Sequence, residues 1–327
     1  FLSTSMAEVE EEKLDWIWYP YLARGELTIL EGDPGLGKSY LAQMVSKAIC
    51  DGGTLPSVKR RPPVEGKIAY FDIENSAGSV TKKRLRENGL VRMHHFFQEV
   101  EPFTIDNDET MDHVYNAIEK LRPTLVVFDT LNTYMGGADT HNSSETQQVF
   151  KRFGDIARRF NCAVMVLRHL TKSTKGTTAL YRGQGSIAFA GFARIVMTVG
   201  VKPDDPEIKV VAVTKINGAR TPKALTFTIE GLPDTVKEQD RSKFSWGDFV
   251  DLTADEIISV PIVRDRDGAL EAACQWLAQA LVDGPVEFKT LIRMGEPRSF
   301  TEKILSRAGE QLGVVKSKGQ WSMAIPS

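Results

Sequence analysis

A glycine-rich segment between an apolar run and a helical pattern narrows the range of folds open to this chain. Residues 32–39 read Gly-Asp-Pro-Gly-Leu-Gly-Lys-Ser, directly after the apolar run 27–30. Helical periodicity then begins and continues to residue 49. A strand, a glycine-rich turn and a helix in this order are typical of α/β folds, in which strands and helices alternate. The segment therefore predicts an α/β protein with this turn at the end of a central strand.

Further apolar runs have the composition of buried strands. They cover residues 67–71, 124–128, 163–167 and 195–199. Helical patterns separate them, the clearest over 111–121 and 145–159. This alternation predicts a twisted, mostly parallel sheet with helices on both faces.

The rest of the chain indicates a second domain. Two β-rich segments, 208–213 and 224–229, flank a turn-rich stretch and predict a hairpin that extends the sheet. We expect residues 14–230 to form the core, and the length of the chain is enough for a core of ~200–250 residues and a small second domain. Residues 231–268 lack a clear period and gather proline and charge, so we expect a connector there. Helical periodicity returns in 269–327 and predicts a small separate domain.

Composition limits the partners and the compartment. The 41 basic and 43 acidic residues give a net charge of -2, which excludes a globally basic nucleic-acid coat. A nucleic-acid partner would need a local basic patch. The three cysteines are far apart and lie in apolar stretches, which indicates reduced thiols and a cytoplasmic location. No apolar run reaches the ~18 residues of a membrane span.

The glycine-rich segment has the pattern of a phosphate-binding (Walker A) loop. Its glycines let backbone N–H groups surround a phosphate at the positive end of the following helix. Lys38 would reach the β- and γ-phosphates of ATP, and the Ser39 hydroxyl would bind Mg²⁺. The predicted nucleotide-binding residues are Gly32, Asp33, Pro34, Gly35, Leu36, Gly37, Lys38, Ser39 and Tyr40.

Acidic residues follow two of the predicted strands. Asp129 ends the run 124–128 and is the expected metal-holding carboxylate, unless it only caps the turn after the strand. Asp72 and Glu74 follow the run 67–71. Hydrolysis of a γ-phosphate needs a carboxylate that orients water and accepts its proton, so this strand end supplies two candidates.

The ordered set of motifs over residues 14 to 230 resembles the RecA-like P-loop ATPases. More narrowly, it resembles the group of RepA-type hexameric replicative helicases, AAA-family ATPases of plasmid and phage type. The resemblance implies that Glu74, the glutamate just past the second strand, polarises water, and that Asp72 is paired locally. It also implies that His169, at the end of 163–167, senses the γ-phosphate. Family members commonly show two histidines here, and Arg168 departs from that pattern.

The resemblance assigns further basic residues to the subunit interface and to DNA. Lys215 corresponds to a basic residue that reaches the neighbouring subunit's nucleotide, whereas Asn217 stands where a second basic residue is common, unless Arg220 replaces it. The basic, glycine-containing segment after His169 resembles a mobile DNA-contacting loop in a central channel, with Lys172, Lys175 and Arg182 as the candidates. The loop 134–142 is a candidate companion.

The end of the chain looks like a winged helix, with three helical patterns and a short hairpin that has a basic tip. Residues 286–320 contain seven basic and four acidic side chains, a local net charge of +3. This pattern favours DNA contact, although winged helices also dock proteins. The candidate DNA-binding residues are Arg298, Lys303, Arg307, Lys316 and Lys318.

These motifs leave alternative functions open. The first is an ATP-driven DNA motor, a RepA-like helicase or translocase whose ring, expected to be a hexamer, encloses single-stranded DNA. The second is a RecA- or RadA-like DNA repair or recombination ATPase that forms filaments. The third is a regulatory ATP-dependent switch that binds DNA or protein without translocation. The phosphate loop is common to all of them.

Overall fold

The computed structural model describes the chain with several gaps, and it divides into two compact units, Phe1–Val260 and Pro261–Ser327. The described residues are 5, 7–11, 13–99, 103–135, 143–170, 191–231, 242–259, 266–282, 284–295, 300, 302–317 and 320–322. Each unit has its own core of buried side chains.

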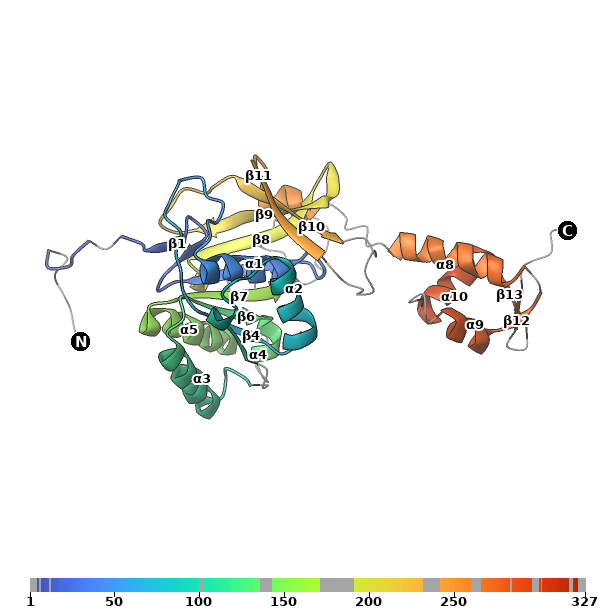
Figure 1. Ribbon diagram of the computed structural model, residues 1–327, viewed down its shortest axis with the longest axis horizontal. Coiled ribbons are helices and arrows are strands. Elements are labelled where there is room, and N and C mark those ends of the chain that lie inside the picture. The colour runs from blue at the N-terminus through green and yellow to red at the C-terminus, as the bar shows by residue number, and fades with distance from the viewer. Residues whose placement is uncertain are drawn as a thin grey trace. The chain divides into compact units, whose positions relative to one another are not determined.

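A nine-stranded sheet forms the centre of the first unit (Figure 1). The strand order is β11-β10-β9-β8-β3-β7-β6-β4-β5. The strands from β8 to β5 in this order run parallel, and β9, β10 and β11 are antiparallel to their neighbours. Their bounds are β3 (Leu27–Gly32), β4 (Ile68–Asp72), β5 (Phe96–Glu99), β6 (Leu125–Asp129), β7 (Ala163–His169), β8 (Ile195–Lys202), β9 (Asp205–Ile216), β10 (Ala224–Gly231) and β11 (Ser242–Val250).

Helices lie on both faces of this sheet. The helices that the structure describes in this unit are α1 (Lys38–Asp51), α2 (Lys82–Glu87), α3 (Asp108–Leu121), α4 (Leu131–Tyr134), α5 (Ser143–Phe160) and α7 (Ala254–Ser259), together with a π-helix, η1 (Ala77–Thr81), and a 3-10 helix, η2 (Met93–His95). Side chains alternate between faces along a strand. On β4, Ala69 and Phe71 pack in the cluster that contains α3 and α5. Tyr70 instead contacts Ser39 of α1, which therefore lies on the other face.

Local sequence explains the clearest elements. All five residues of β6 are buried, as expected for a parallel strand covered on both faces. Helix α3 buries Met111, Val114 and Ile118 on one stripe. The side chain of Asn107 caps it by accepting from the N–H groups of Glu109 and Thr110. The predicted α/β class, with a mostly parallel sheet, is confirmed.

The expectation of a connector over 231–268 was wrong in its middle part. Strand β11 pairs with β10 along its length, and α7 packs against β8 and β9 through a small cluster that includes Ile257 and Ile258. An edge strand needs few apolar residues, and the apolar content of β11 is low. The alternation of Phe244 and Trp246 with polar residues is the sequence signal that could have predicted this strand. The first unit therefore extends to Val260, beyond the predicted limit of the core.

A two-stranded ribbon precedes the P-loop strand. It consists of β1 (Trp16–Trp18) and β2 (Leu22–Ala23). The N–H of Gly25 donates to the carbonyl of Cys162 just before β7 begins, so the ribbon lies at the amino end of the parallel strands. This places it at the sheet edge opposite the carboxyl ends, where the glycine-rich loop lies.

The second unit is a small helical domain with a three-stranded antiparallel sheet of order β12-β14-β13. Its elements are α8 (Arg266–Ala280), β12 (Val286–Glu287), α9 (Phe288–Gly295), α10 (Glu302–Gln311), β13 (Val315–Ser317) and β14 (Gln320–Ser322). Trp321 of β14 stacks on Phe288 at 4.2 Å between ring centroids and closes the core formed by Leu277, Leu291 and Ala308. In the part of the chain that the structure describes, no helix is long and apolar enough to cross a membrane.

Gly200 of β8 tests whether α7 belongs to the core. A Cβ at Gly200 would overlap the backbone carbonyl of Ile257 in α7. We expect Gly200→Ala to destabilise the unit by about 1–3 kcal/mol, because the overlap involves backbone. Hydrogen exchange of α7 and β8 in the full chain measures this. Gly231→Ala is the matched control, since a Cβ there meets nothing within 4 Å. Equal protection in both variants would contradict the packing.

Candidate functional site

The glycine-rich loop joins β3 to α1 and leaves the first turn of that helix uncapped by any side chain. Gly37, the N-cap residue, has φ 81°, and Gly35 has φ 85°. Only glycine adopts this region at low cost. A Cβ at Gly32 would lie 2.6 Å from the carbonyl oxygen of Val199, and one at Gly37 would overlap the side chain of Ile229 on β10. The loop is therefore closely packed from behind, while the start of α1 provides N–H groups for an anion.

Lys38 holds a buried ammonium group inside this loop. Its Nζ donates to the carbonyls of Gly32 and Asp33, at 2.9 Å each, and lies 3.1 Å from Nδ1 of His169. Burial lowers the pKa of Lys38 to about 8, and the charge of Asp129 opposes this shift. A phosphate beside Nζ would favour the charged form further, so the residue fits an anionic ligand.

Asp129 lies at the end of β6 against the start of α1. Its Oδ1 accepts from the Ser39 hydroxyl at 3.1 Å, and its Oδ2 accepts from the Tyr70 hydroxyl at 2.9 Å. Burial raises the pKa of Asp129 to about 6, and the nearby charge of Asp72 raises it further. The two predicted metal-binding residues are therefore brought together. Tyr70 was missed by the sequence analysis, although its alternation with Ala69 and Phe71 places it on the α1 face.

The two acidic residues after β4 have different surroundings. Asp72 is 1% exposed and accepts from the N–H groups of Glu74 and Asn75, at 3.0 and 2.9 Å. The Asn75 side chain donates to its other oxygen at 3.0 Å. Burial raises the pKa of the Asp72 carboxyl. Asp72 thus shapes the turn that presents Glu74, and Gln98 supports the same turn by donating to its carbonyls.

Glu74 is exposed, and its carboxylate is oriented by two threonines. Its Oε1 accepts from the hydroxyl of Thr130 at 3.1 Å and from that of Thr133 at 3.0 Å. Both threonines follow β6, shortly after Asp129. Sequence reasoning missed them, because their relation to Glu74 arises only when β4 and β6 pair.

Arg168 and His169 lie on opposite faces of β7. His169 is half-buried against Lys38, and both burial and the Lys38 charge lower the pKa of its imidazole. Arg168 is 5% exposed, and its Nε lies 3.1 Å from Oε2 of Glu31 on β3. The hydroxyl of Thr198 donates to the same carboxylate at 3.2 Å. Arg168, which stands where the resembled family commonly has a second histidine, therefore forms a buried ion pair behind the loop. Of these two residues, His169 is the one that lies beside Lys38.

Tyr40 attaches strand β11 to the helix that carries the loop. Its hydroxyl donates to the carbonyl of Ser242 at 2.8 Å and accepts from the Asn88 amide at 2.7 Å. Asn88 in turn accepts from the N–H of Phe244 at 2.8 Å. The side chain of Tyr40 thus packs against β11. Its backbone N–H, in the first turn of α1, is the group that could donate to a phosphate.

The structure does not bring Lys215 to this site. Its Nζ donates to the carbonyl of Ala193 at 2.8 Å. Lys215 pairs with Val196 on β8, whereas Gly32 pairs with Val199. Three residues of strand correspond to about 10 Å, and two strand spacings add a similar distance sideways. Lys215 therefore lies away from the loop of its own subunit.

Most of the predicted DNA-binding residues lie outside the described residues. These are Lys172, Lys175, Arg182, Arg298 and Lys318, together with the side chains of Lys303 and Lys316. Arg307 is described and is exposed on α10. Of the loop 134–142, only Tyr134 and Met135 are described, and both are buried.

The residues present fit a magnesium nucleotide. The described parts of the chain contain no group of three His, Cys, Asp or Glu that could hold a metal alone. Mg²⁺ usually keeps several waters and is held by one or two carboxylates plus phosphate oxygens, which matches Ser39 and Asp129 beside an anion site. Together with the order of β8, β3, β7, β6 and β4, these features define a P-loop nucleotide-binding site on a RecA-like α/β core.

The chain belongs to the AAA domain family, whose model matches residues 2–175. It is similar to the DNA repair protein RadA of Streptococcus pneumoniae, with 22% identity over 54% of this chain and 37% of that protein. RadA of Halalkalibacterium halodurans is 26% identical over 45% of this chain and 28% of that protein. A KaiC-like protein from Pyrococcus horikoshii matches with a TM-score of 0.48 and 12% identity, over 64% of this chain and 90% of that chain. The chain thus spans about a third of the length of these RadA relatives.

The pKa of Asp129 predicts a pH dependence of stability. Its folded value of about 6 lies above the ordinary 3.8, so the folded state holds this proton more tightly than the unfolded state does. The resulting stabilisation is present below about pH 4 and is lost as the pH rises through 6, a change of about 3 kcal/mol. Asp129→Asn should remove this loss.

Urea unfolding of the full chain between pH 4 and pH 7, without nucleotide or magnesium, measures the difference. The two proteins are compared by the slope of unfolding free energy with pH, because the substitution also changes the bonds to Ser39 and Tyr70. Parallel curves for the two proteins would contradict the assigned shift.

Proposed function

We propose that this protein is an ATP-dependent DNA motor, a RepA-like replicative helicase or translocase that hydrolyses ATP at subunit interfaces. One observation carries the proposal. Ser39 and Asp129 are hydrogen-bonded at the carboxyl edge of the sheet, with Lys38 and Glu74 close enough for their charges to interact with Asp129. Lys215 instead lies near the opposite end of β8. A basic residue so placed cannot complete its own subunit's site, but it can complete that of a neighbour in a head-to-tail assembly.

In this proposal, the loop amides and Lys38 bind the β- and γ-phosphates. Ser39 and Asp129 would hold Mg²⁺, which would supply positive charge beside the phosphate oxygens. Glu74 orients the attacking water and accepts its proton. Thr130 and Thr133 fix the direction of that carboxylate, so the base is positioned before ATP arrives.

His169 would report the state of the γ-phosphate. Its ring nitrogen lies 3.1 Å from Nζ of Lys38, so a change at the lysine alters the charge next to the imidazole. The chain continues from His169 into the segment that contains Lys172, Lys175 and Arg182. A basic segment attached directly to the sensor is suited to pass the nucleotide state to DNA, single-stranded and in a central channel.

The proposed assembly is a ring, and a hexamer is the expected form. Head-to-tail contacts close into a ring when the rotation between subunits divides a full turn. The second unit is proposed to be a winged helix. Its order of α8, β12, α9, α10, β13 and β14 supports this assignment, and exposed Arg307 on α10 suits contact with DNA phosphates.

A DNA repair or recombination ATPase is the second candidate. Curated relatives that match part of the chain, such as those of Streptococcus pneumoniae and Halalkalibacterium halodurans, are named DNA repair protein RadA, and this favours it. A helicase unwinds a duplex on a forked substrate through a closed ring, whereas a filament-forming ATPase grows with the length of the DNA. Native mass measurements with nucleotide and DNA of two lengths separate them once the mass of the DNA is subtracted: one fixed number of subunits, or whole multiples of it, supports the ring, and a number that increases steadily with DNA length contradicts it.

Glu74→Gln tests the assignment of the base. The amide keeps the size of the side chain but cannot accept a proton, so turnover should fall by about 10²–10⁴-fold. Nucleotide affinity should stay within about threefold, because the phosphate contacts come from the loop. ATP hydrolysis and equilibrium nucleotide binding measure the two effects. Glu119→Gln, an exposed change on α3, is the control. Unchanged hydrolysis in Glu74→Gln would remove this residue from the mechanism.

Lys215 is tested by mixing two inactive variants. Lys215→Ala should assemble with nucleotide but hydrolyse little, because each site lacks the neighbour's cation. Glu74→Gln keeps Lys215 but has no base. In a random equal mixture, about a quarter of the interfaces combine an intact Glu74 with an intact Lys215, so hydrolysis should reappear. Normal hydrolysis by Lys215→Ala alone, or a mixture as inactive as its parts, would show that catalysis does not cross subunits.

A further inference from the structure

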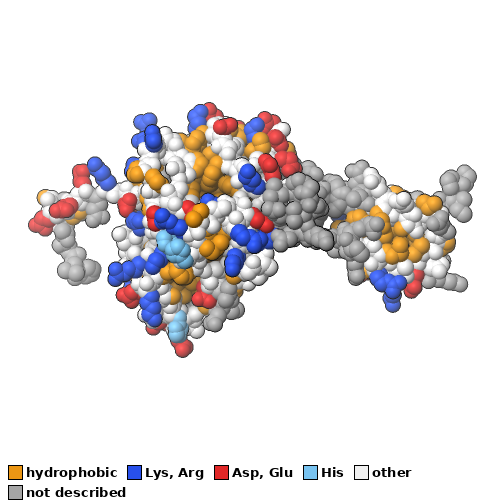
Figure 2. Space-filling model, in the orientation of Figure 1, with side chains coloured by type: hydrophobic (Ala, Val, Ile, Leu, Met, Phe, Trp, Pro, Cys, Tyr) orange, Lys and Arg blue, Asp and Glu red, His pale blue; other side chains and the backbone are white. Residues whose placement is uncertain are grey.

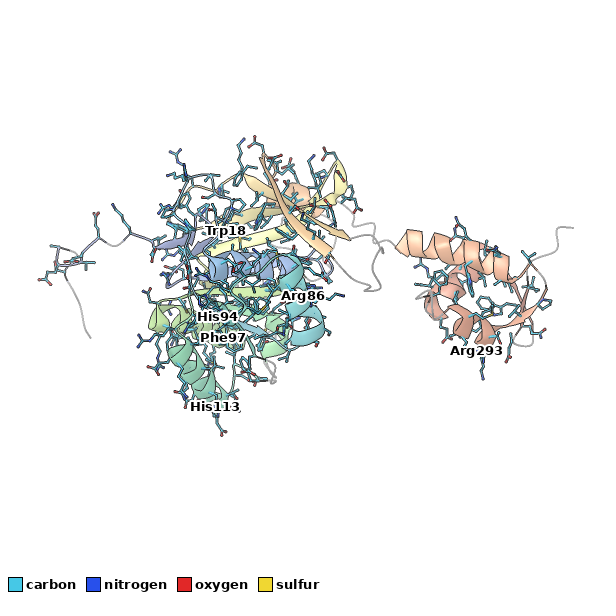
Figure 3. All side chains as sticks on the ribbon, in the orientation of Figure 1. Trp18, Arg86, His94, Phe97, His113 and Arg293 are labelled. Carbon is cyan, nitrogen blue, oxygen red and sulfur yellow. The ribbon has the colours of Figure 1, made fainter. Side chains whose placement is uncertain are left out.

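A hollow of about 360 Å³ lies beside β1, on the side of the first unit away from the phosphate loop. It is lined by Ile17 to Tyr19 and by residues 53–57 and 59–64, which follow α1. Helix α1 begins at the phosphate loop and its 14 residues span about 20 Å, so the hollow lies at the far end of this helix. Figure 3 labels Trp18 in this region. The nucleotide site therefore does not include it.

The loop that forms the hollow is held in place by side-chain hydrogen bonds. The indole Nε1 of Trp18 donates to the carbonyl of Pro56 at 2.6 Å. The hydroxyl of Ser57 donates to the carbonyl of Tyr19 at 2.7 Å. Prolines at 62 and 63 limit the backbone further. The basic residues between these points are thus presented on an anchored loop.

Three consecutive basic side chains line this hollow. Nζ of Lys59 lies 5.3 Å from the centroid of the Tyr19 ring, and Cζ of Arg61 lies 5.0 Å from it. Arg60 also lines the hollow, and all three are exposed. Figure 2 shows Lys and Arg side chains on the surface of the first unit around β1. A cation held over a ring keeps its N–H groups available to an anion, since the ring occupies only one side of the charge.

Nearby carboxylates do not neutralise this cluster. Asp15 pairs with Arg24 at 3.0 Å, and Glu65 pairs with Arg92. Within the described ranges, no salt bridge includes Lys59, Arg60 or Arg61. Three positive charges therefore remain beside an aromatic ring, in a hollow large enough for a nucleotide-sized group.

We propose that this basic hollow binds the phosphate backbone of a single strand of nucleic acid. Uncompensated cations supply contacts that do not depend on sequence, and aromatic and guanidinium planes stack on bases of any kind. The choice of DNA as the strand rests on the proposed function, while the site itself is separate from ATP hydrolysis. It gives the protein a contact with DNA outside the segments 172–182 and 298–318.

Binding of a fluorescent oligo-dT strand to the full-length chain, without nucleotide, tests the proposal. Anisotropy titrations at several salt concentrations compare wild type with K59Q/R60Q/R61Q. Loss of three phosphate contacts should weaken binding by roughly tenfold or more at physiological salt and reduce the slope of log K against log salt by about 2. The matched control K82Q/K120Q/K151Q removes the same charge from exposed positions and should stay within about twofold.

Several results would overturn the proposal. These are equal affinity and equal salt slope in wild type and K59Q/R60Q/R61Q, an equal loss in the control, or a change in self-association without a change in DNA binding. The last result would assign the hollow to a second copy of the chain. Inorganic tripolyphosphate provides the remaining arm. If it displaces the strand from wild type no better than sodium chloride of equal ionic strength does, a strand is supported as the ligand. If it displaces the strand at far lower concentration from wild type but not from K59Q/R60Q/R61Q, the hollow is assigned to free phosphate and the proposal is overturned.

Failure here is distinguishable from failure of the proposed function. The basic hollow contains no residue of the ATP site, so basal hydrolysis should be unchanged in K59Q/R60Q/R61Q. Normal DNA unwinding by this variant would leave the proposed function supported and would contradict only the role of the basic hollow. If the wild-type protein binds the strand through the basic hollow but DNA does not stimulate its hydrolysis, the role of the hollow is supported and the motor function is contradicted.

Discussion

The buried ammonium group of Lys38 is the interaction on which the site depends. Two loop carbonyls accept from it, and the negative charges of Asp129 and Asp33 do not fully offset the burial that lowers its pKa. The folded protein therefore holds a cation whose environment favours an incoming anion. Packing of Val199 and Ile229 behind the glycines keeps the loop in this form before any ligand arrives. The cost of organising the site is thus met during folding.

Strand β7 shows how one element serves both stability and chemistry. Successive side chains of a strand point to opposite faces, so Arg168 and His169 contact different parts of the protein. Arg168 joins Glu31 in a buried pair behind β3, and this pair is arranged in the same register that brings His169 opposite Gly32. Such a pair is weak support for stability, because desolvation opposes the attraction, yet it favours one alignment of the two strands over others.

The sheet also separates two ends of the first unit. Its carboxyl edge carries the loop and the acidic residues, while Lys215 and the β1 ribbon lie toward the other end. A RecA-like core that belongs to the AAA domain family thus presents different chemistry at each end. Lys215 lies away from the loop of its own subunit, and in the function proposed above it acts on the nucleotide of a neighbour.

Local sequence patterns were enough to predict the parallel sheet, the phosphate loop and the strand-end positions of Glu74, Asp129 and His169, because buried strands and a glycine turn leave strong signals. They did not reveal β11, whose edge position demands few apolar residues. Nor did they reveal Tyr70, Thr130 and Thr133 as partners of the acids, or the pairing of Arg168 with Glu31. These relations join strands far apart in the chain. They follow from the assembled sheet alone, since strand order and register determine which side chains meet.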